Sequence, residues 1–257
     1  MFNLINTAHA AGEGISVHLD PVIVTHVAGI PITATLITVW LTMLLMGILA
    51  YFAGKNPTLV PSKLQSAFEV LIGGAYDYIE GVLESKERTA KYFPIIMTIF
   101  LFVLAMNWVG LLPGVTSIGM YDAENHFIPF LYPPATDLNI TIAFALIAFF
   151  TIEVAGIMAV GAWKYGGKFI NFSSPLAFII GLIELLSELA RLISFSFRLF
   201  GNIFAGKTLL LVVMFLATPY VLPVPLIAYE FFVGFIQAFI FAILTLYFIK
   251  LATEEPH

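Results

Sequence analysis

The chain alternates between long apolar runs and short polar segments. Five runs reach the roughly 20 apolar residues that a helix needs to cross a bilayer. They lie at 27–53, 92–113, 138–162, 176–217 and 226–251. Glycine and proline follow the first two runs in "GKNP" and "LPG", and such residues end helices. The pattern therefore predicts an all-α integral membrane protein with about five membrane-crossing helices.

The segment 57–84 has a different pattern. Its apolar residues recur every three or four positions, and four acidic residues occupy the other faces. A helix with one apolar and one charged face lies on a membrane rather than through it. We therefore predict an amphipathic interfacial helix at 57–84.

The run 176–217 contains 42 residues without a proline. A continuous helix of that length would extend about 63 Å, twice the thickness of the bilayer core, so it must tilt steeply or break. If the run is one crossing, eight basic residues fall on one side of the membrane and none on the other, which is typical of cytoplasmic loops. These residues are Lys55, Lys63, Lys86, Arg88, Lys91, Lys164, Lys168 and Lys250. We therefore predict an inclined helix, an outer N-terminal segment 1–26, a cytoplasmic C-terminus, and 57–84 on the cytoplasmic surface.

The amino-acid composition further limits the class of protein to which the chain can belong. Apolar residues make up 60% of the 257 and charged residues 11%, and the mean hydropathy is +1.00. A large soluble domain is therefore excluded, and we treat 1–257 as a single membrane domain in contact with lipid. The absence of cysteine excludes disulfides and thiolate metal sites. No basic tract suits nucleic acid, and we expect neither a metal nor a cofactor.

The sequence "GNIFAGKT" at 201–208 has the spacing of a phosphate-binding loop of nucleotide-hydrolysing proteins. Such a loop is a turn between a strand and a helix, and it lies in water. This stretch instead lies inside an apolar run, where exposed irregular backbone is not tolerated. We therefore expect no ATP chemistry in this chain.

Ionisable residues interrupt the longest apolar run. Steps of three and four place six polar residues on one helix face: Glu184, Glu188, Arg191, Ser194, Arg198 and Asn202. A charge near the bilayer centre costs from roughly 2.5 to about 17 kcal/mol, so such residues normally face a bundle interior or a water-filled path. For the first three residues a second interpretation stays open, a local network of opposite charges that only solubilises the helix end.

Arg198 has no carboxylate within one helical turn, because the nearest one on its helix, Glu188, lies about 15 Å away. The guanidinium stays protonated, so we predict that it meets an anion from another element or another subunit. If the last two helices are antiparallel, Lys207 lies at the depth of Glu230, and Arg198 at the depth of Gln237. We predict contacts within both pairs. A purely structural ion pair between Lys207 and Glu230 is the alternative.

The stretches "SFRLFGNIFAGKTLL" and "GFIQAFIFAILTLYF" closely resemble subunit a of the rotary F-type ATP synthase. The resemblance extends to "MNWVGLLPG", "PPATDLNIT" and the terminal "EE". It implies that 176–217 and 226–251 form an inclined hairpin against a ring of c subunits. The implied partners are that ring, the peripheral-stalk b subunits and the remainder of the F1F0 complex. The implied location is a bacterial inner membrane, with organelle inner or thylakoid membranes as alternatives.

The resemblance also implies a function and residue roles. Two offset proton half-channels and a fixed arginine, Arg198, would couple proton flow to ring rotation and so to ATP synthesis. The residues of the outer half-channel would be Asn107, Lys207, Glu230 and Gln237. Those of the cytoplasmic half-channel would be Glu184, Ser187 and Arg191. Asn202 and Glu188 would have supporting roles.

The chain departs from the family pattern at a few positions. Many members have glutamate or histidine where Lys207 stands, and histidine where Glu230 stands, so which of the two relays protons stays open. Gly110 stands where some members have aspartate. For Glu153, inside 138–162, a structural contact and a place on the outer path are both open. Coupling to sodium rather than protons also stays open, because the carboxylate of the ring sets it.

A self-contained ion channel or a secondary transporter is the alternative function, with the stripe binding an anionic substrate. Transporters often contain inverted repeats and broken helices. The sequence has no evident repeat, so we favour the stator subunit.

Overall fold

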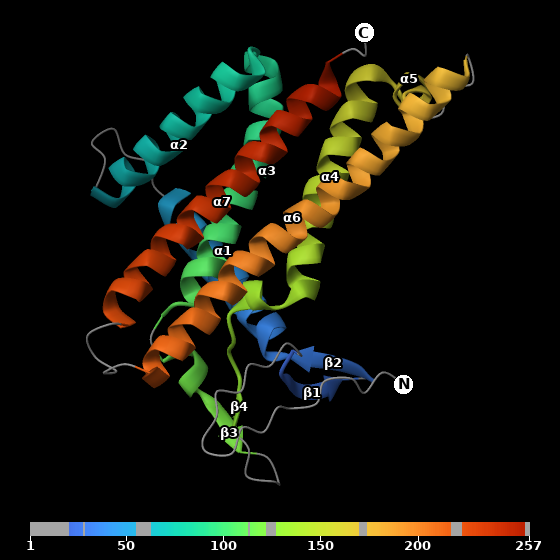
Figure 1. The fold of residues 1–257 in the computed structure, drawn as a ribbon. Coiled ribbons are helices and arrows are strands. Elements are labelled where there is room, and N and C mark those ends of the chain that lie inside the picture. Colours follow the sequence, from blue (N-terminus) through green and yellow to red (C-terminus); the bar gives the residue numbers. More distant parts are fainter. Residues whose placement is uncertain are drawn as a thin grey trace.

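The computed structural model describes residues 21–27, 29–54, 63–112, 114–121, 127–169, 174–216 and 223–254. Within these ranges the chain is almost entirely helical, as the sequence predicts for an all-α membrane protein (Figure 1). The helices are α1 (Ala34–Gly54), α2 (Lys63–Leu83), α3 (Lys86–Val109), α4 (Leu138–Val160), α5 (Ala162–Gly167), α6 (Pro175–Leu216) and α7 (Pro223–Thr253). Two antiparallel hairpins and two single-turn 3₁₀ helices, Val115–Ser117 and Pro134–Thr136, complete the described chain.

Four of the described helices, α1, α3, α4 and α7, are long and apolar enough to cross a membrane. The protein is therefore a multi-pass membrane protein. α6 is longer than any of them and carries the ionisable stripe. α2, the predicted amphipathic helix, packs on α3 and α7. The first residues of that prediction, 57–62, lie outside the described ranges.

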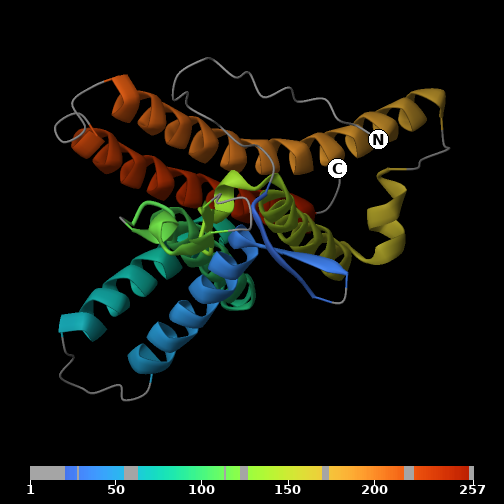
Figure 2. The same ribbon diagram turned by 90° about the horizontal axis from the view of Figure 1, so that it is seen from below.

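α6 is one unbroken helix of 42 residues, and Gly201 and Asn202 lie inside it. Of the two alternatives for this segment, tilt or break, the break is therefore excluded. α6 and α7 run antiparallel and side by side, and α4 packs against both (Figures 1 and 2). Seen from below, α1 and α2 lie on the far side of the bundle from α6 (Figure 2).

The predicted start of the first helix at residue 27 is wrong. A hairpin precedes α1, made of β1 (Ile23–Val27) and β2 (Ile30–Thr33). Gly29 has a φ of 83°, a conformation that glycine adopts without strain, and it reverses the chain between the strands. The apolar run therefore includes both a strand and a helix, and hydropathy alone does not separate them.

Other helix boundaries also differ from the prediction. α3 begins at Lys86 rather than at residue 92, because Ser85 caps it by accepting a hydrogen bond from the Arg88 backbone N–H at 3.4 Å. α4 ends at Val160, where Gly161 has a φ of 93°. α7 begins at Pro223, since proline suits the first turn of a helix. The loop between α3 and α4 contains the second hairpin, β3 (Gly119–Tyr121) and β4 (Phe127–Pro129).

The core lies among α3, α4, α6 and α7. Phe195 of α6 stacks on Phe241 of α7, with ring centroids 4.9 Å apart. α4 supplies small buried residues to the same core, Ala145, Ala148 and Ala155. Small side chains let helices in membranes approach closely. This packing fixes the rotation of α6 about its own axis.

That rotation determines where the polar stripe lies. Phe195, Leu199 and Ile203, four residues apart, are buried and form the inner face of α6. Arg198 and Asn202 each precede one of these residues, so they lie at the edge of the buried face. Arg198 is half-buried and Asn202 is exposed. This second half of the stripe therefore follows the border between the bundle and its surroundings.

Candidate functional site

The first half of the stripe forms a charge network with α5. Glu188 is only 5% exposed and accepts a hydrogen bond from the Arg191 guanidinium at 2.6 Å. The Lys168 ammonium, at the C-terminal end of α5, lies 3.4 Å from Glu188 and 3.3 Å from Glu184. The network that the sequence left open does form, but it contains a second cation. From the sequence, Lys168 was used only to predict which side of the membrane its loop occupies.

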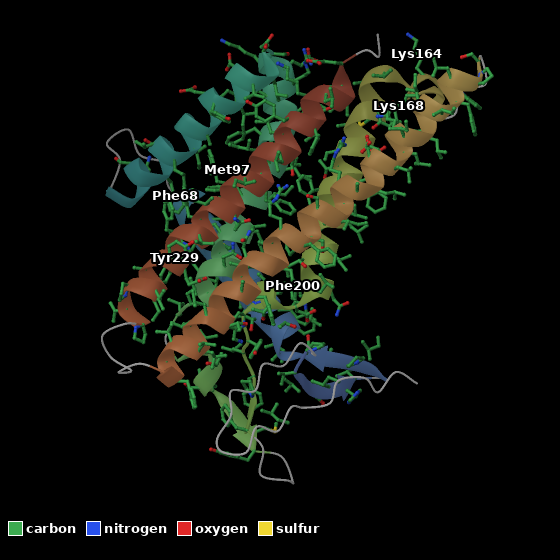
Figure 3. The ribbon with its side chains drawn as sticks, in the orientation of Figure 1. Phe68, Met97, Lys164, Lys168, Phe200 and Tyr229 are labelled. Carbon is green, nitrogen blue, oxygen red and sulfur yellow. The ribbon has the colours of Figure 1, made fainter. Side chains whose placement is uncertain are left out.

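This network borders a cavity of about 290 Å³ between α5, α6 and α7. The three residues predicted for the cytoplasmic half-channel line it: Glu184, Ser187 and Arg191. On the α7 side the Arg191 guanidinium lies 3.8 Å from the centroid of the Phe248 ring. Figure 3 shows Lys168 at the end of the bundle where α5 and the start of α6 meet. The cavity thus lies at the end of the bundle for which the basic residues predict a cytoplasmic location.

Glu153 of α4 and Tyr165 of α5 lie beside this cavity. Tyr165 is buried, and burial together with the Glu153 and Glu188 carboxylates raises the pKa of its hydroxyl. Glu153 is therefore a neighbour of the cavity, and not of the residues predicted for the outer path. Of the two alternatives left open for Glu153, a structural contact and a place on the outer path, this position favours the first. α5 begins two positions after the last residue of α4, and this short connection brings Tyr165 close to Glu153. No spacing in the sequence indicated that the two residues would meet.

Arg198 makes few contacts. Its Nη2 donates a hydrogen bond to Ser194 Oγ at 3.3 Å, and its backbone carbonyl accepts one from Asn202 Nδ2 at 2.9 Å. Nη1 is buried and has no hydrogen-bond partner in the described structure. The described residues offer it no carboxylate within ion-pair distance. The guanidinium is thus an uncompensated cation at the edge of the bundle.

The sequence predicts a contact between Arg198 and Gln237, and the structure shows no hydrogen bond between them. Gln237 Oε1 is buried and, like Arg198 Nη1, has no partner among the described residues. Helical side chains lean toward the N-terminus of their own helix, and Arg198 accordingly reaches back to Ser194. Equal depth on two helices was therefore not sufficient for a contact.

The predicted ion pair between Lys207 and Glu230 is also absent. The Lys207 ammonium lies 3.2 Å from the centroid of the Tyr132 ring, which is a cation–π contact. Glu230 is 4% exposed, and its carboxyl packs against Gly206 so closely that a Cβ there would overlap it. Consecutive residues of a helix point about 100° apart, so Gly206 and Lys207 face different neighbours. Nothing in the sequence indicated Tyr132.

Asn107 connects α3 to α7. Its Nδ2 donates a hydrogen bond to the Gly234 carbonyl at 3.0 Å, and the neighbouring Trp108 indole donates one to the Phe231 carbonyl at 3.1 Å. Asn107 is 2% exposed, and its Oδ1 has no partner in the described chain. The end of α3 is thus fixed against α7 one turn from Glu230, with an acceptor left free.

Six buried side-chain atoms lack a hydrogen-bond partner within the described residues. They are Asn107 Oδ1, Glu153 Oε1, the Tyr165 hydroxyl, Arg198 Nη1, Lys207 Nζ and Gln237 Oε1. Buried polar groups nearly always have partners, so such a set indicates sites for water or for another molecule. Four of the six residues were predicted as site residues from the sequence, and Tyr165 was not. The part of the chain that the structure describes holds no cluster of three or more potential metal ligands.

Comparisons with known proteins identify the family that the chain resembles along most of its length. Residues 36–250 match the family model described as ATP synthase A chain. The chain is 34% identical to ATP synthase subunit a 1 of Pelobacter propionicus, over 85% of this chain and 86% of that protein. It is 34% identical to ATP synthase subunit a of Geobacter sulfurreducens, with the same coverage, and 31% identical to that of Moorella thermoacetica, over 90% of this chain and 96% of the relative.

Proposed function

Because the chain belongs to the ATP synthase A chain family, we propose that it provides two offset proton half-channels and a fixed arginine. These couple proton flow across the membrane to rotation of a ring of c subunits, and so to ATP synthesis. The chain works with that ring, the peripheral-stalk b subunits and the rest of the F-type complex. It lies in a bacterial inner membrane, with its N-terminus outside and its C-terminus in the cytoplasm.

The observation that carries the proposal is the separation of two polar groups along α6. One group surrounds the cavity between Glu184 and Arg191, and the other lies around Lys207 and Glu230. Arg198 lies between them, about 10 Å along the helix from Arg191 and about 14 Å from Lys207. Ionisable groups at such depths are retained where they meet water or a partner charge. Two separate polar regions with a cation between them suit two offset half-channels.

Arg198 acts on a carboxylate of the ring. An adjacent cation favours the ionised form of a carboxylate, so a ring carboxyl loses its proton as it approaches Arg198 and regains one beyond it. The flanking residues Ile193 and Phe197 are 57% and 55% exposed, and an apolar ring surface would cover them. Each proton that crosses releases about 2.3 kcal/mol per 100 mV, and the offset converts this into rotation.

Glu230 is the proton-exchanging group of the outer half-channel. It is buried beside Gly206, and none of the described cations lies within ion-pair distance of it. Without a paired cation, the carboxyl can take up and release a proton. Lys207 is held on Tyr132 instead and contributes positive charge near the outer end. The free Asn107 Oδ1 and Gln237 Oε1 offer hydrogen-bond acceptors to water between Glu230 and the ring.

The proposal is tested with the complete complex in vesicles. An imposed proton gradient drives ATP synthesis, and a protonophore stops it. Synthesis that follows only a sodium gradient would reassign the coupled ion. Ion flux that continues at full rate when the ring is cross-linked to the stator would favour a self-contained channel and would refute the proposal.

Gly206→Ala is expected to lower proton-driven ATP synthesis by about tenfold, because the added Cβ displaces the carboxyl that exchanges protons in the outer half-channel. Gly47→Ala in α1 is the matched control, since a Cβ there meets no atom within 4 Å. ATP synthesis by vesicles of equal subunit content measures both. A wild-type rate in Gly206→Ala would show that the position of Glu230 does not matter.

A further inference from the structure

The connecting segment before α4, residues 132–137, runs through the interior of the bundle. Residues 133–137 are all buried, and Tyr132 is half-buried. The 3₁₀ helix Pro134–Thr136 inside this segment contacts both α1 and α6 (Figure 2). Connecting segments usually run over the surface of a protein. This one instead joins α1, on the far side of the bundle, to the helix that carries the ionisable stripe.

Two threonines of α1 hold the ends of the segment. Thr38 Oγ1 accepts a hydrogen bond from the Tyr132 backbone N–H at 3.0 Å, and Thr35 Oγ1 donates one to Asp137 Oδ2 at 2.7 Å. Thr38 is fully buried, and Thr35 is 1% exposed. The Thr38 hydroxyl donates its own proton to the Ala34 carbonyl at 2.9 Å, which leaves its oxygen as the acceptor for Tyr132. The backbone position of Tyr132 is therefore fixed by α1.

The ring of Tyr132 determines where the charge of Lys207 lies. The ammonium is 3.2 Å from the ring centroid, and Nζ is buried without a hydrogen-bond partner among the described residues. The ring face attracts the cation through its quadrupole. Within the part of the chain that the structure describes, this ring is the group that holds the ammonium.

Without the ring, the ammonium of Lys207 can reach Glu230. The Glu230 carboxyl packs against Gly206, the residue before Lys207, and neighbouring Cα atoms are only about 3.8 Å apart. Lysine carries its charge on a flexible four-carbon stem. An ion pair would give each of these buried groups a partner of opposite charge, and it would hold Glu230 in its ionised form. An ionised, paired Glu230 would no longer exchange protons.

We propose that Tyr132, fixed by Thr38 of α1, is a positioning residue that keeps the Lys207 ammonium away from Glu230. This role rests on the function proposed above, in which Glu230 exchanges protons in the outer half-channel. Tyr132 transfers no proton itself. It acts through Lys207, because the ring binds the cation and leaves the Glu230 carboxyl without a charge partner. α1, which supplies no residue to the proposed half-channels, thereby affects proton exchange in the outer one.

The test is proton-driven ATP synthesis by the complete complex in vesicles of equal subunit content. Tyr132→Leu removes the aromatic ring and is expected to lower the rate by about tenfold, because an adjacent cation favours an ionised carboxylate by about that factor or more. Adding Lys207→Gln removes the cation and is expected to restore the rate to within about threefold of wild type. Such a rescue shows that the two residues act through one interaction.

Three further variants sharpen the result. Tyr132→Phe keeps the ring and is expected to restore the rate of Tyr132→Leu to within about twofold of wild type. Thr38→Val removes the acceptor for the Tyr132 N–H and is expected to lower the rate by about threefold, with the same rescue by Lys207→Gln. Tyr121→Leu is the matched control and is expected to keep the wild-type rate. Tyr121 lies in β3 of the same loop, is exposed, and contacts the Phe127 ring.

A wild-type rate in Tyr132→Leu would overturn the positioning role. So would a slow Tyr132→Leu that Lys207→Gln does not restore, which is the result that a merely structural role produces. If Tyr132→Leu does not assemble, Thr38→Val with and without Lys207→Gln decides in the same way.

Arg198→Ala, measured in parallel, separates the two proposals. Coupling that survives in Arg198→Ala refutes the proposed function. Coupling lost there, together with a wild-type or unrestored rate in Tyr132→Leu, refutes the positioning role alone.

Discussion

Replacing Arg198 by alanine is expected to reduce proton-driven ATP synthesis to about one hundredth of the wild-type rate or less. Its Nη1 is buried without a partner, and the described chain provides no carboxylate for it, so its charge is available to another subunit. Removing one preorganised electrostatic contact at a reaction site typically costs about 100-fold or more. ATP synthesis in vesicles that contain the complete complex measures the effect.

Ser194→Ala is the matched control for Arg198→Ala. It removes the hydroxyl that accepts a hydrogen bond from Arg198 Nη2 at 3.3 Å, and it leaves the charge in place. Near-wild-type synthesis is expected, because the guanidinium then only loses one local contact. Subunit content must be equal in all vesicles, so that a lost subunit is not counted as lost coupling. An assembled Arg198→Ala complex that makes ATP at the wild-type rate would contradict the account.

The next largest effect is expected for Glu230→Gln, which should lower the rate of proton-driven ATP synthesis by about 100-fold. The glutamine is nearly the same size, so it fits against Gly206, but it cannot take up or release a proton. Glu230 is 4% exposed and is a buried carboxyl of the outer polar group. The measurement is again synthesis at equal subunit content, with the proton gradient as the variable.

Lys207→Gln provides the comparison. It removes a positive charge that rests on the Tyr132 ring and makes no hydrogen bond to the described residues. Lys207→Gln is expected to lower the rate of ATP synthesis by less than about threefold. A cation–π contact contributes about 0.5–2 kcal/mol to local packing, and it does not transfer a proton. The reverse order, with Lys207→Gln much slower than Glu230→Gln, would assign the relay to Lys207.

The long helix was the strongest prediction from sequence alone. The choice between tilt and break depended on the positions of basic residues such as Lys250, and the structure has an unbroken α6 through Gly201 and Asn202. The stripe was also predictable, because helical periodicity alone brings Glu188 and Arg191 together. These inferences needed only geometry within one helix.

Contacts between elements were harder to predict. Equal depth suggested that Lys207 would meet Glu230, but a contact also requires that both side chains point into the same gap. Burial of Phe195 and Leu199 fixes the rotation of α6, and that rotation turns Gly206 rather than Lys207 toward Glu230. The sequence contains no direct signal for this rotation.

Residues from connecting segments were missed for a related reason. Tyr132 lies in the segment before α4. Tyr165 lies in α5, the short helix after α4, and Lys168 follows the last residue of α5. The contacts of Tyr165 and Lys168 depend on how the chain reverses at Gly161, whose φ is 93°. The sequence marks a turn there but not its direction. Each of these side chains nevertheless contacts a residue or lines a cavity of the predicted half-channels.

The central claim is that Arg198 separates two half-channels, and passive proton leak tests it most directly. The measurement uses vesicles with the complete complex, the ring cross-linked to the stator, and an imposed membrane potential. We predict that wild-type vesicles are tight, that Arg198→Ala vesicles leak protons, and that adding Glu230→Gln stops the leak. Arg198→Ala vesicles as tight as wild type, or a leak that Glu230→Gln leaves unchanged, would contradict the account.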